Sequence, residues 1–336
     1  MDLKNATISY FRLFRFQTTG LIASLFLIGA VITGQSDPYL LIIIFLIGVF
    51  YHIYMYVLND YMDLEVDKQS KDLQRKPLVS GMIAPKTGLI IAMVAGVITY
   101  ILTIIYFPYF YPILILTLAV LLGTIYDCFG KKMPGLSDFT MAGSLAFAFL
   151  FGASTILTPF STVTILVGLL IFIFVVYGNA VEGGLKDVDH DYLGGAKTLA
   201  TVMGVKVKNE QLLLTKKFSF FSYGIELISF ALILLLAAQP EINIFSKSEY
   251  LKLIIVIILI IVTFISTVRF LSLKKFDRSL MKKLFGIINS SSGALIIIMI
   301  FPIIGLEKTI ILLILPITWY IIFNTILYGK PMQPDI

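Results

Sequence analysis

A cluster of acidic residues lies within residues 59–67, where Asn59, Asp63 and Asp67 are four residues apart and Asp60 lies three residues before Asp63. Side chains at such intervals share one face of a helix. Three carboxylates on one face repel each other unless a cation neutralises them. Carboxylate oxygens are ligands that Mg²⁺ prefers, and the ion is commonly shared with substrate phosphates. The cluster therefore predicts a magnesium and diphosphate site, although a solvated helix end with balanced charges also explains the cluster taken alone.

A second acidic cluster contains Asp187 and Asp191, which are again four residues apart. Glycines lie on both sides of it, so the backbone there can bend and approach a ligand closely. Lys186 directly precedes the cluster and could neutralise a bound diphosphate. We assign no role to Asp189 or His190, since a histidine without a second one nearby is more typical of a solvated position than of a metal ligand.

The elements that must position these clusters are membrane helices. Of the 336 residues, 58% are hydrophobic and 14% are charged, whereas a soluble domain carries charge on about a quarter of its residues. Apolar runs of about 20 residues are long enough to span a bilayer as helices. Pro302 and Gly305 leave the last division open, so nine or ten helices are expected. The expected spans are 10–34, 38–59, 86–106, 110–127, 137–157, 161–182, 215–238, 250–272, 282–303 and 308–328.

The distribution of Lys and Arg predicts the orientation of these helices. If the N-terminus is cytoplasmic, every Lys and Arg except Lys247, Lys252 and Lys308 falls on the cytoplasmic side, as the positive-inside rule requires. The net charge of +6 is therefore a topology signal, and no nucleic-acid partner is expected. The same parity places both acidic clusters on the cytoplasmic face. Two acidic motifs that face each other there would form a two-metal clamp for a diphosphate.

At these residues the chain resembles the UbiA superfamily of intramembrane prenyltransferases. The first cluster is similar to the family pattern N-D-x-x-D-x-x-x-D, and the second is similar to D-x-x-x-D. Residues 76–81 resemble the R-P-x-x-S-G segment, with Lys76 where the family usually has arginine. Lysine keeps the charge but loses the bidentate fork. Tyr126 with Lys131 or Lys132 resembles the tyrosine and basic residue that contact the diphosphate in the family.

The resemblance implies a single all-α transmembrane domain over residues 1–336, with its active-site mouth on the cytoplasmic side of the cell membrane and with 308–328 as an extra helix if there are ten. It implies an enzyme that transfers a prenyl group from an allylic polyprenyl diphosphate to a lipophilic acceptor, which is a quinone precursor, a pigment or a glycerol-phosphate ether. The implied cofactor is Mg²⁺, held by Asp60, Asp63, Asp67, Asp187 and Asp191. The implied diphosphate contacts are Asn59, Lys76, Tyr126, Lys131, Lys132 and Lys186.

Other protein classes remain open at this point. A transporter can use intramembrane acids for cation coupling, but it would place them near the bilayer midplane. The acidic clusters of this chain are instead expected at helix ends. A CDP-alcohol phosphotransferase also uses acidic metal motifs in a membrane, but the signature D-G-x-x-A-R is absent from the sequence. A purely structural membrane protein gives no reason for two clustered acidic faces. Substrate-dependent release of pyrophosphate distinguishes the prenyltransferase from the transporter.

Overall fold

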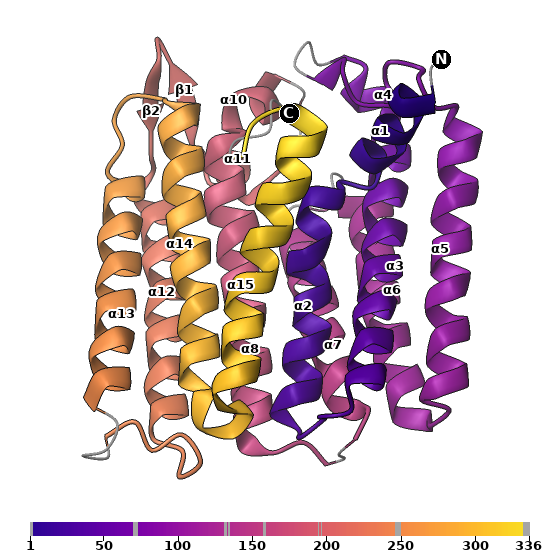
Figure 1. Ribbon diagram of the computed structural model, residues 1–336. Helices are drawn as coiled ribbons and strands as arrows, with labels where there is room; N and C mark the ends of the chain where they lie inside the picture. The colour runs from indigo at the N-terminus through magenta and orange to yellow at the C-terminus, as the bar shows by residue number, and fades with distance from the viewer. Residues whose placement is uncertain are drawn as a thin grey trace. The chain divides into compact units, whose positions relative to one another are not determined.

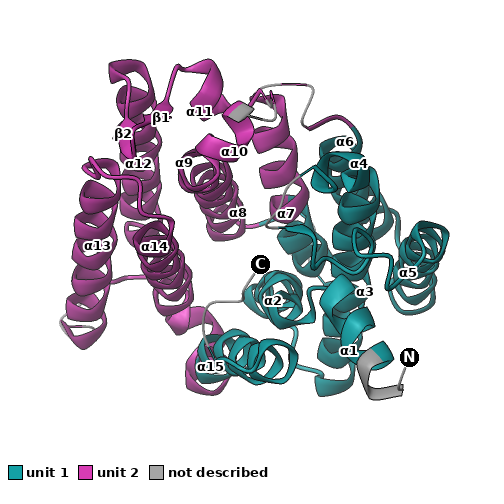
Figure 2. Ribbon diagram, turned by 90° about the horizontal axis from the view of Figure 1, so that it is seen from above, with its two compact units in different colours: residues 1–128, 147–160, 310–336 teal, residues 129–146, 161–309 magenta. Residues whose placement is uncertain are grey.

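The chain folds into a succession of long helices (Figure 1). The computed structural model describes residues 3–69, 73–130, 133, 135–156, 159–193, 195, 197–245 and 250–331. These residues form two compact units, coloured separately in Figure 2. Unit 1 contains Met1–Cys128, Phe147–Phe160 and Ile310–Ile336, and unit 2 contains Phe129–Ala146 and Ser161–Thr309. The two units are considered one at a time below.

Within the described residues, nine helices are long and apolar enough to cross a membrane. A further pair, α1 (Leu3–Leu13) and α2 (Phe16–Ile32), is bent by 43° at its break and makes a tenth if it is one span. The prediction of a polytopic helical bundle with nine or ten helices is therefore confirmed. The nine are α3 (Pro38–Met62), α5 (Pro85–Tyr106), α6 (Phe110–Phe129), α7 (Leu136–Ser154), the continuous run Thr162–Lys186, α12 (Lys216–Ala237), α13 (Tyr250–Leu271), α14 (Arg278–Met299) and α15 (Phe301–Tyr328).

The last two helices divide slightly differently from the sequence prediction. Helix α14 ends at Met299, and α15 begins at Phe301 with Pro302 in its first turn, where proline is tolerated. Gly305 has a φ of 78° and interrupts the helical backbone inside α15. A positive φ is available to glycine because it has no Cβ. The expected boundary at residues 303–308 is thus a backbone break near the start of one helix.

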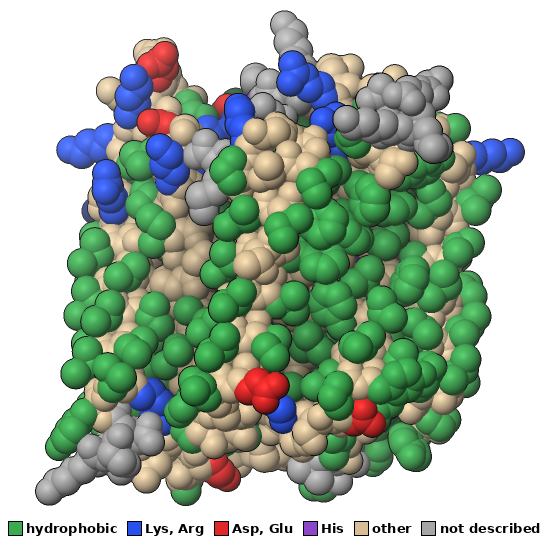
Figure 3. Space-filling view, viewed as in Figure 1, with side chains coloured by type: hydrophobic (Ala, Val, Ile, Leu, Met, Phe, Trp, Pro, Cys, Tyr) green, Lys and Arg blue, Asp and Glu red, His purple; other side chains and the backbone are tan. Residues whose placement is uncertain are grey.

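Exposed apolar side chains on the long helices fit a lipid environment. Helix α13 leaves Ile257, Ile258, Ile261 and Ile265 exposed. A soluble monomer rarely exposes apolar patches larger than a few hundred Å². In Figure 3 hydrophobic side chains cover the helical part of unit 2, whereas Lys and Arg side chains gather at the end of that unit where strands β1 (Lys206–Lys208) and β2 (Gln211–Leu213) lie.

Close helix packing holds unit 1 together. A Cβ placed on Gly29 of α2 would collide with the backbone carbonyl of Phe149, and a Cβ on Gly152 would collide with the carbonyl of Phe26. The two glycines therefore let α2 and the end of α7 approach each other at backbone distance. Small residues at helix contacts are typical of membrane helices, because dispersion contacts replace the hydrophobic effect in lipid.

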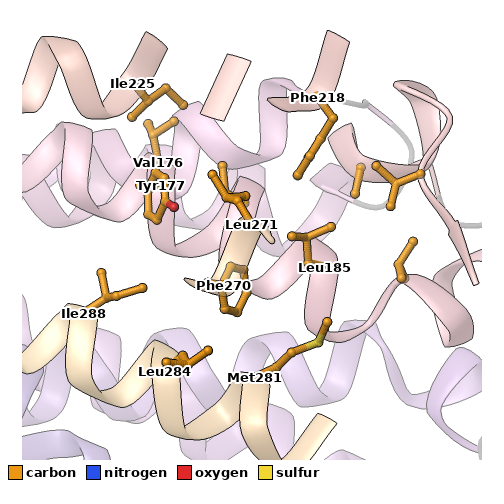
Figure 4. Packing of buried hydrophobic residues seen from close by; sticks show 14 of the residues in the cluster. Val176, Tyr177, Leu185, Phe218, Ile225, Phe270, Leu271, Met281, Leu284 and Ile288 are labelled. Carbon is orange, nitrogen blue, oxygen red and sulfur yellow. The ribbon is translucent and has the colours of Figure 1, made fainter. Parts of the chain in front are cut away.

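Unit 2 has a core of buried apolar side chains from several helices (Figure 4). Met281, Leu284 and Ile288 lie on one face of α14, at intervals of three and four residues. They pack in the same cluster as Tyr177 and Leu185, which belong to the run from Thr162 to Lys186. That run is not a uniform α-helix. It consists of α8 (Thr162–Val176), a π-helical segment η3 (Tyr177–Gly183) and α9 (Gly184–Lys186).

The two long segments that separate the expected spans 38–59 and 86–106, and 161–182 and 215–238, contain short elements of their own. The first holds α4 (Leu64–Asp67), and the second holds α10 (Val188–Leu193), α11 (Leu199–Val202) and the β1–β2 hairpin. The hairpin pairs Lys206 with Leu213 and turns through Asn209 and Glu210, both of which have positive φ. Two positive φ values are characteristic of the tight turns that suit the twist of antiparallel strands. These strands are a small addition to an otherwise helical chain.

Candidate active site

The first acidic motif lies where α3 ends and α4 begins in unit 1. Asp63 is the residue between the two helices, and its amide nitrogen donates to the carbonyl of Asn59 over 2.9 Å. The amide of Asp67 donates in turn to the carbonyl of Asp63 over 2.8 Å. The backbone therefore keeps a helical spacing through the motif, although α3 itself ends at Met62.

Lys76 holds two carboxylates of this motif together. Its Nζ lies 2.8 Å from Asp60 Oδ1 and 2.7 Å from Asp67 Oδ2. Asp60 and Asp67 are 3% and 4% exposed, and a buried carboxylate is costly unless a cation or donors pair with it. The position of Lys76 is set by a turn in which the Ser80 amide donates to the Lys76 carbonyl over 2.9 Å. The motif and the segment after it thus form one ionic cluster.

Arg15 is a second cation on Asp60, and no spacing rule relates the two residues. Its Nη2 lies 2.7 Å from Asp60 Oδ1. Arg15 occupies the break between α1 and α2 with a φ of 44°, which turns the chain so that the guanidinium also lies over the ring of Tyr56 at 5.0 Å. A non-glycine residue with positive φ is uncommon and marks a locally constrained backbone. The bend between α1 and α2 therefore places a cation on the acidic motif.

Asp127 is a further acidic residue of this site that sequence reasoning missed. Asn59 donates from Nδ2 to Asp127 Oδ1 over 3.1 Å. Asp127 is 7% exposed, and its Oδ2 is buried without a hydrogen-bond partner among the described residues. It follows Tyr126 directly on α6, so a polar residue inside an apolar span was the available signal.

The other predicted contacts of unit 1 are only partly described. Tyr126 lies on α6 beside Asp127 and is partly buried. Lys131 and Lys132 lie outside the described residues. Glu65, which neither the pattern nor the resemblance selects, forms an exposed pair with Lys68 at 2.7 Å.

The second acidic motif follows α9 in unit 2. Asp187 is half-exposed, and Lys186 Nζ lies 3.1 Å from its Oδ2. The amide of Asp191 donates to the carbonyl of Asp187 over 2.9 Å, so both residues lie on one face of the helical turn that begins α10. Asp187 and Asp191 are both more exposed than Asp60.

Asp189 has a different place in this motif. Arg278 at the start of α14 donates from Nη2 to Asp189 Oδ1 over 2.6 Å and from Nε to the carbonyl of Lys186 over 3.2 Å. Arg278 therefore connects α14 to the turn that contains Asp187. Asp189, to which the sequence analysis assigns no role, is thus paired with Arg278 within the fold.

The donor sets of both motifs suit a hard divalent cation. In unit 1 the oxygens of Asp60 and Asp67 converge on one cationic atom, Lys76 Nζ, and Asp127 offers a buried free oxygen. In the part of the chain that the structure describes, no group of three or more His, Cys, Asp or Glu residues is arranged to hold a metal by itself. Mg²⁺ typically binds one or two carboxylates and completes its shell with water and substrate phosphate oxygens. The residues fit such a shared site.

Curated proteins similar in sequence to this chain share one name. A digeranylgeranylglyceryl phosphate synthase from Saccharolobus solfataricus is 26% identical over 151 residues, which cover 45% of this chain and 52% of the relative. A protein of the same name from Hyperthermus butylicus is 27% identical over 192 residues, covering 56% and 61%. The chain thus spans about half the length of the curated relatives it matches.

Solved structures share the fold over nearly the whole chain. A structure of a digeranylgeranylglyceryl phosphate synthase superposes with a TM-score of 0.67 at 18% identity and covers 90% of this chain and 100% of its own. A UbiA homologue from Archaeoglobus fulgidus bound to GPP and Mg²⁺ has a TM-score of 0.63 at 19% identity and covers 89% and 100%. Residues 21–238 match the UbiA prenyltransferase family, which is well over half of the chain. The chain belongs to the UbiA prenyltransferase family.

Proposed function

We propose that this protein transfers a prenyl group from an allylic polyprenyl diphosphate to a lipophilic acceptor within the membrane and releases diphosphate. The observation that carries the proposal is the ionic cluster of Asp60, Asp67 and Lys76 at the end of α3. Buried carboxylates that already surround a cation are suited to bind a metal–diphosphate head group. A transferase whose leaving group is diphosphate needs such a binding site. Family membership supports the same reaction.

Mg²⁺ would be held by Asp60, Asp63 and Asp67 from the first motif and by Asp187 and Asp191 from the second. When bound, it supplies positive charge that stabilises the leaving diphosphate. Lys76 and Lys186 supply further positive charge to the leaving group, and we assign Asn59, Tyr126, Lys131 and Lys132 to the same diphosphate. The surrounding apolar helices exclude water, so that the acceptor rather than water captures the prenyl group.

For the acceptor we propose a glyceryl phosphate lipid in preference to a quinone precursor or a pigment. The two curated relatives above are named digeranylgeranylglyceryl phosphate synthases, which supports this choice. We further propose that the protein lies in the cell membrane with its N-terminus and both acidic motifs on the cytoplasmic side, because the distribution of Lys and Arg favours that orientation.

The test is an assay of the purified protein in lipid nanodiscs with labelled geranylgeranyl diphosphate, Mg²⁺ and three acceptors, one from each class. We expect diphosphate release together with a prenylated glyceryl lipid, and loss of both in excess EDTA. Turnover that persists in EDTA would contradict the metal assignment. No diphosphate release with any acceptor would contradict prenyl transfer and favour a transporter.

A further inference from the structure

A polar contact inside unit 2 involves Glu182, which lies about one helical turn before Lys186 in the same helical run. Asn289 on α14 donates from Nδ2 to Glu182 Oε2 in η3 over 2.8 Å. Glu182 is 1% exposed, and its Oε1 is buried without a hydrogen-bond partner among the described residues. A buried acid inside a membrane span is costly and is typically functional. Neither the acidic motifs nor the diphosphate contacts account for this pair.

The contact fixes which way the Asn289 amide points. The same Nδ2 also donates to the carbonyl of Phe285 over 2.9 Å, and a carbonyl oxygen can only accept. The nitrogen therefore faces Phe285 and Glu182, and both of its hydrogens are engaged. The group left over is Oδ1, which can only accept a hydrogen bond.

The surroundings leave Oδ1 accessible. Asn289 is exposed although it lies near the middle of the 22-residue helix α14. A Cβ built on Gly286 or Gly293, three and four residues away on the same helix face, would meet no described atom within 4 Å. A Cβ on Gly178 would lie 3.7 Å from Asn289 Oδ1 and 3.6 Å from Glu182 Oε2, so the absence of a side chain there also leaves room.

The elements that carry the pair are firmly packed. Figure 4 shows Leu284 and Ile288 of α14 together with Tyr177 and Leu185, in the core that joins α14 to η3 and α9. The π-helical segment is itself notable, because π-helical turns are rare and occur frequently at functional sites. A rigid acceptor at mid-span of a membrane helix is costly in hydrocarbon unless a donor reaches it.

We propose that Asn289, held in position by Glu182, forms a binding site for a hydroxyl group of the lipid acceptor. The proposal rests on the proposed function for the identity of the lipid. The ligand group must donate a hydrogen bond, because every donor of the Asn289 amide is already used. An alcohol meets this condition, and the free hydroxyl of a glyceryl phosphate lipid is an alcohol. Asn289 is then a specificity-determining residue, and Glu182 is a positioning residue that acts through it.

The test compares two radiolabelled lipids with the full-length protein in nanodiscs, without donor, so that no transfer occurs. The first is a glyceryl phosphate monoether with one geranylgeranyl chain and a free hydroxyl, and the second is the same lipid with that hydroxyl methylated. We expect the wild type to bind the free hydroxyl about tenfold more tightly, as suits one hydrogen bond in an apolar site. Asn289→Leu should remove this preference, and Ser290→Ala, which deletes an exposed hydroxyl on the next residue, should keep it.

Variants of Glu182 separate positioning from folding. Glu182→Gln retains an acceptor oxygen and should keep the preference, whereas Glu182→Leu should lose it. If Glu182→Leu fails to fold, Asn289→Leu alone decides, because residue 289 is exposed. An unchanged preference in Asn289→Leu, or equal affinity of the wild type for both lipids, overturns the proposal.

A second readout keeps this inference apart from the proposed function. Asn289→Leu should bind labelled geranylgeranyl diphosphate with Mg²⁺ as the wild type does, because Asn289 contacts neither acidic motif. Donor binding without diphosphate release in the wild type contradicts the proposed transfer reaction. A wild type that binds both lipids with equal affinity contradicts the proposed Asn289 site.

Discussion

Asn59 on α3 and Asp127 on α6 are joined by a hydrogen bond of 3.1 Å between Asn59 Nδ2 and Asp127 Oδ1. The bond ties the first residue of the acidic motif to the residue after Tyr126, so two segments far apart in the sequence form one polar group in unit 1. The position of the motif therefore depends on a carboxylate that belongs to no recognised pattern.

Replacing Asp127 tests this dependence. Asp127→Asn keeps an oxygen that accepts from Asn59, so the free energy of unfolding should change by less than about 0.5 kcal/mol. Asp127→Leu leaves the partly buried Asn59 amide without its acceptor, which costs about 1–3 kcal/mol. Equilibrium unfolding in mild detergent measures the free energy of unfolding of both variants. Equal stability of the two variants would show that the hydrogen bond is not what holds the motif.

Lys76 is expected to contribute to both folding and activity. Lys76→Ala leaves Asp60 with one cation and removes the contact of Asp67 with Nζ, and breaking a buried ion pair typically costs about 3–5 kcal/mol. Prenyl transfer should be lost as well, whereas Lys76→Arg should retain much of it. The matched control is Arg75→Ala, because Arg75 is exposed and its loss should alter stability by less than about 0.5 kcal/mol. A Lys76→Ala protein with wild-type stability would contradict the ionic cluster.

Asp187 and Asp189 are two residues apart but should behave differently. Asp187→Asn is expected to abolish transfer with little change in unfolding temperature, because Asp187 is half-exposed and proposed to bind Mg²⁺. Asp189→Asn weakens the contact with Arg278, a partly exposed pair whose loss costs about 0.2–1 kcal/mol, and should leave most of the transfer activity. Parallel assays of activity and unfolding separate the two roles. The reverse pattern would exchange the assignments.

Gly29 and Gly224 provide a matched pair for helix packing. Gly29→Ala places a methyl group against the carbonyl of Phe149, and such overpacking costs about 1–3 kcal/mol. Gly224→Ala in α12 meets no described atom within 4 Å, and the better helix propensity of alanine should stabilise the protein by about 0.5–1 kcal/mol. Thermal unfolding of both variants, compared with the wild type, measures these changes in stability. A Gly29→Ala protein as stable as the wild type would contradict the close approach of α2 and α7.

Much of the fold is predictable because its main signals, the apolar spans, are local features of the sequence. Each apolar span is a local property, and lipid forces it to be helical, so the spans differ from the observed helices by only a few residues at most ends. Local pattern does not reveal the break at Arg15 or the hairpin turn at Asn209 and Glu210, because these depend on positive φ at non-glycine residues. Local pattern does not reveal the π-helical segment at Tyr177–Gly183 either, although Gly178 and Gly183 interrupt the apolar run there.

The candidate site is only partly predictable. Helical spacing groups Asp60 with Asp67, and in the structure both carboxylates contact Lys76. Arg15 and Asp127 reach the motif through tertiary contacts, which no spacing rule contains. A polar residue inside an apolar span was the sequence signal for Asp127, and the same signal marks Glu182 and Asn289.

The central claim is that both acidic motifs serve the diphosphate of the donor. Equilibrium binding of labelled geranylgeranyl diphosphate with Mg²⁺, measured for the wild type, Asp63→Asn and Asp187→Asn, tests it most directly. The account predicts that each single variant binds at least about tenfold more weakly, a loss of about 1.4 kcal/mol, and that the wild type behaves likewise in EDTA. Wild-type affinity in either variant would contradict the claim.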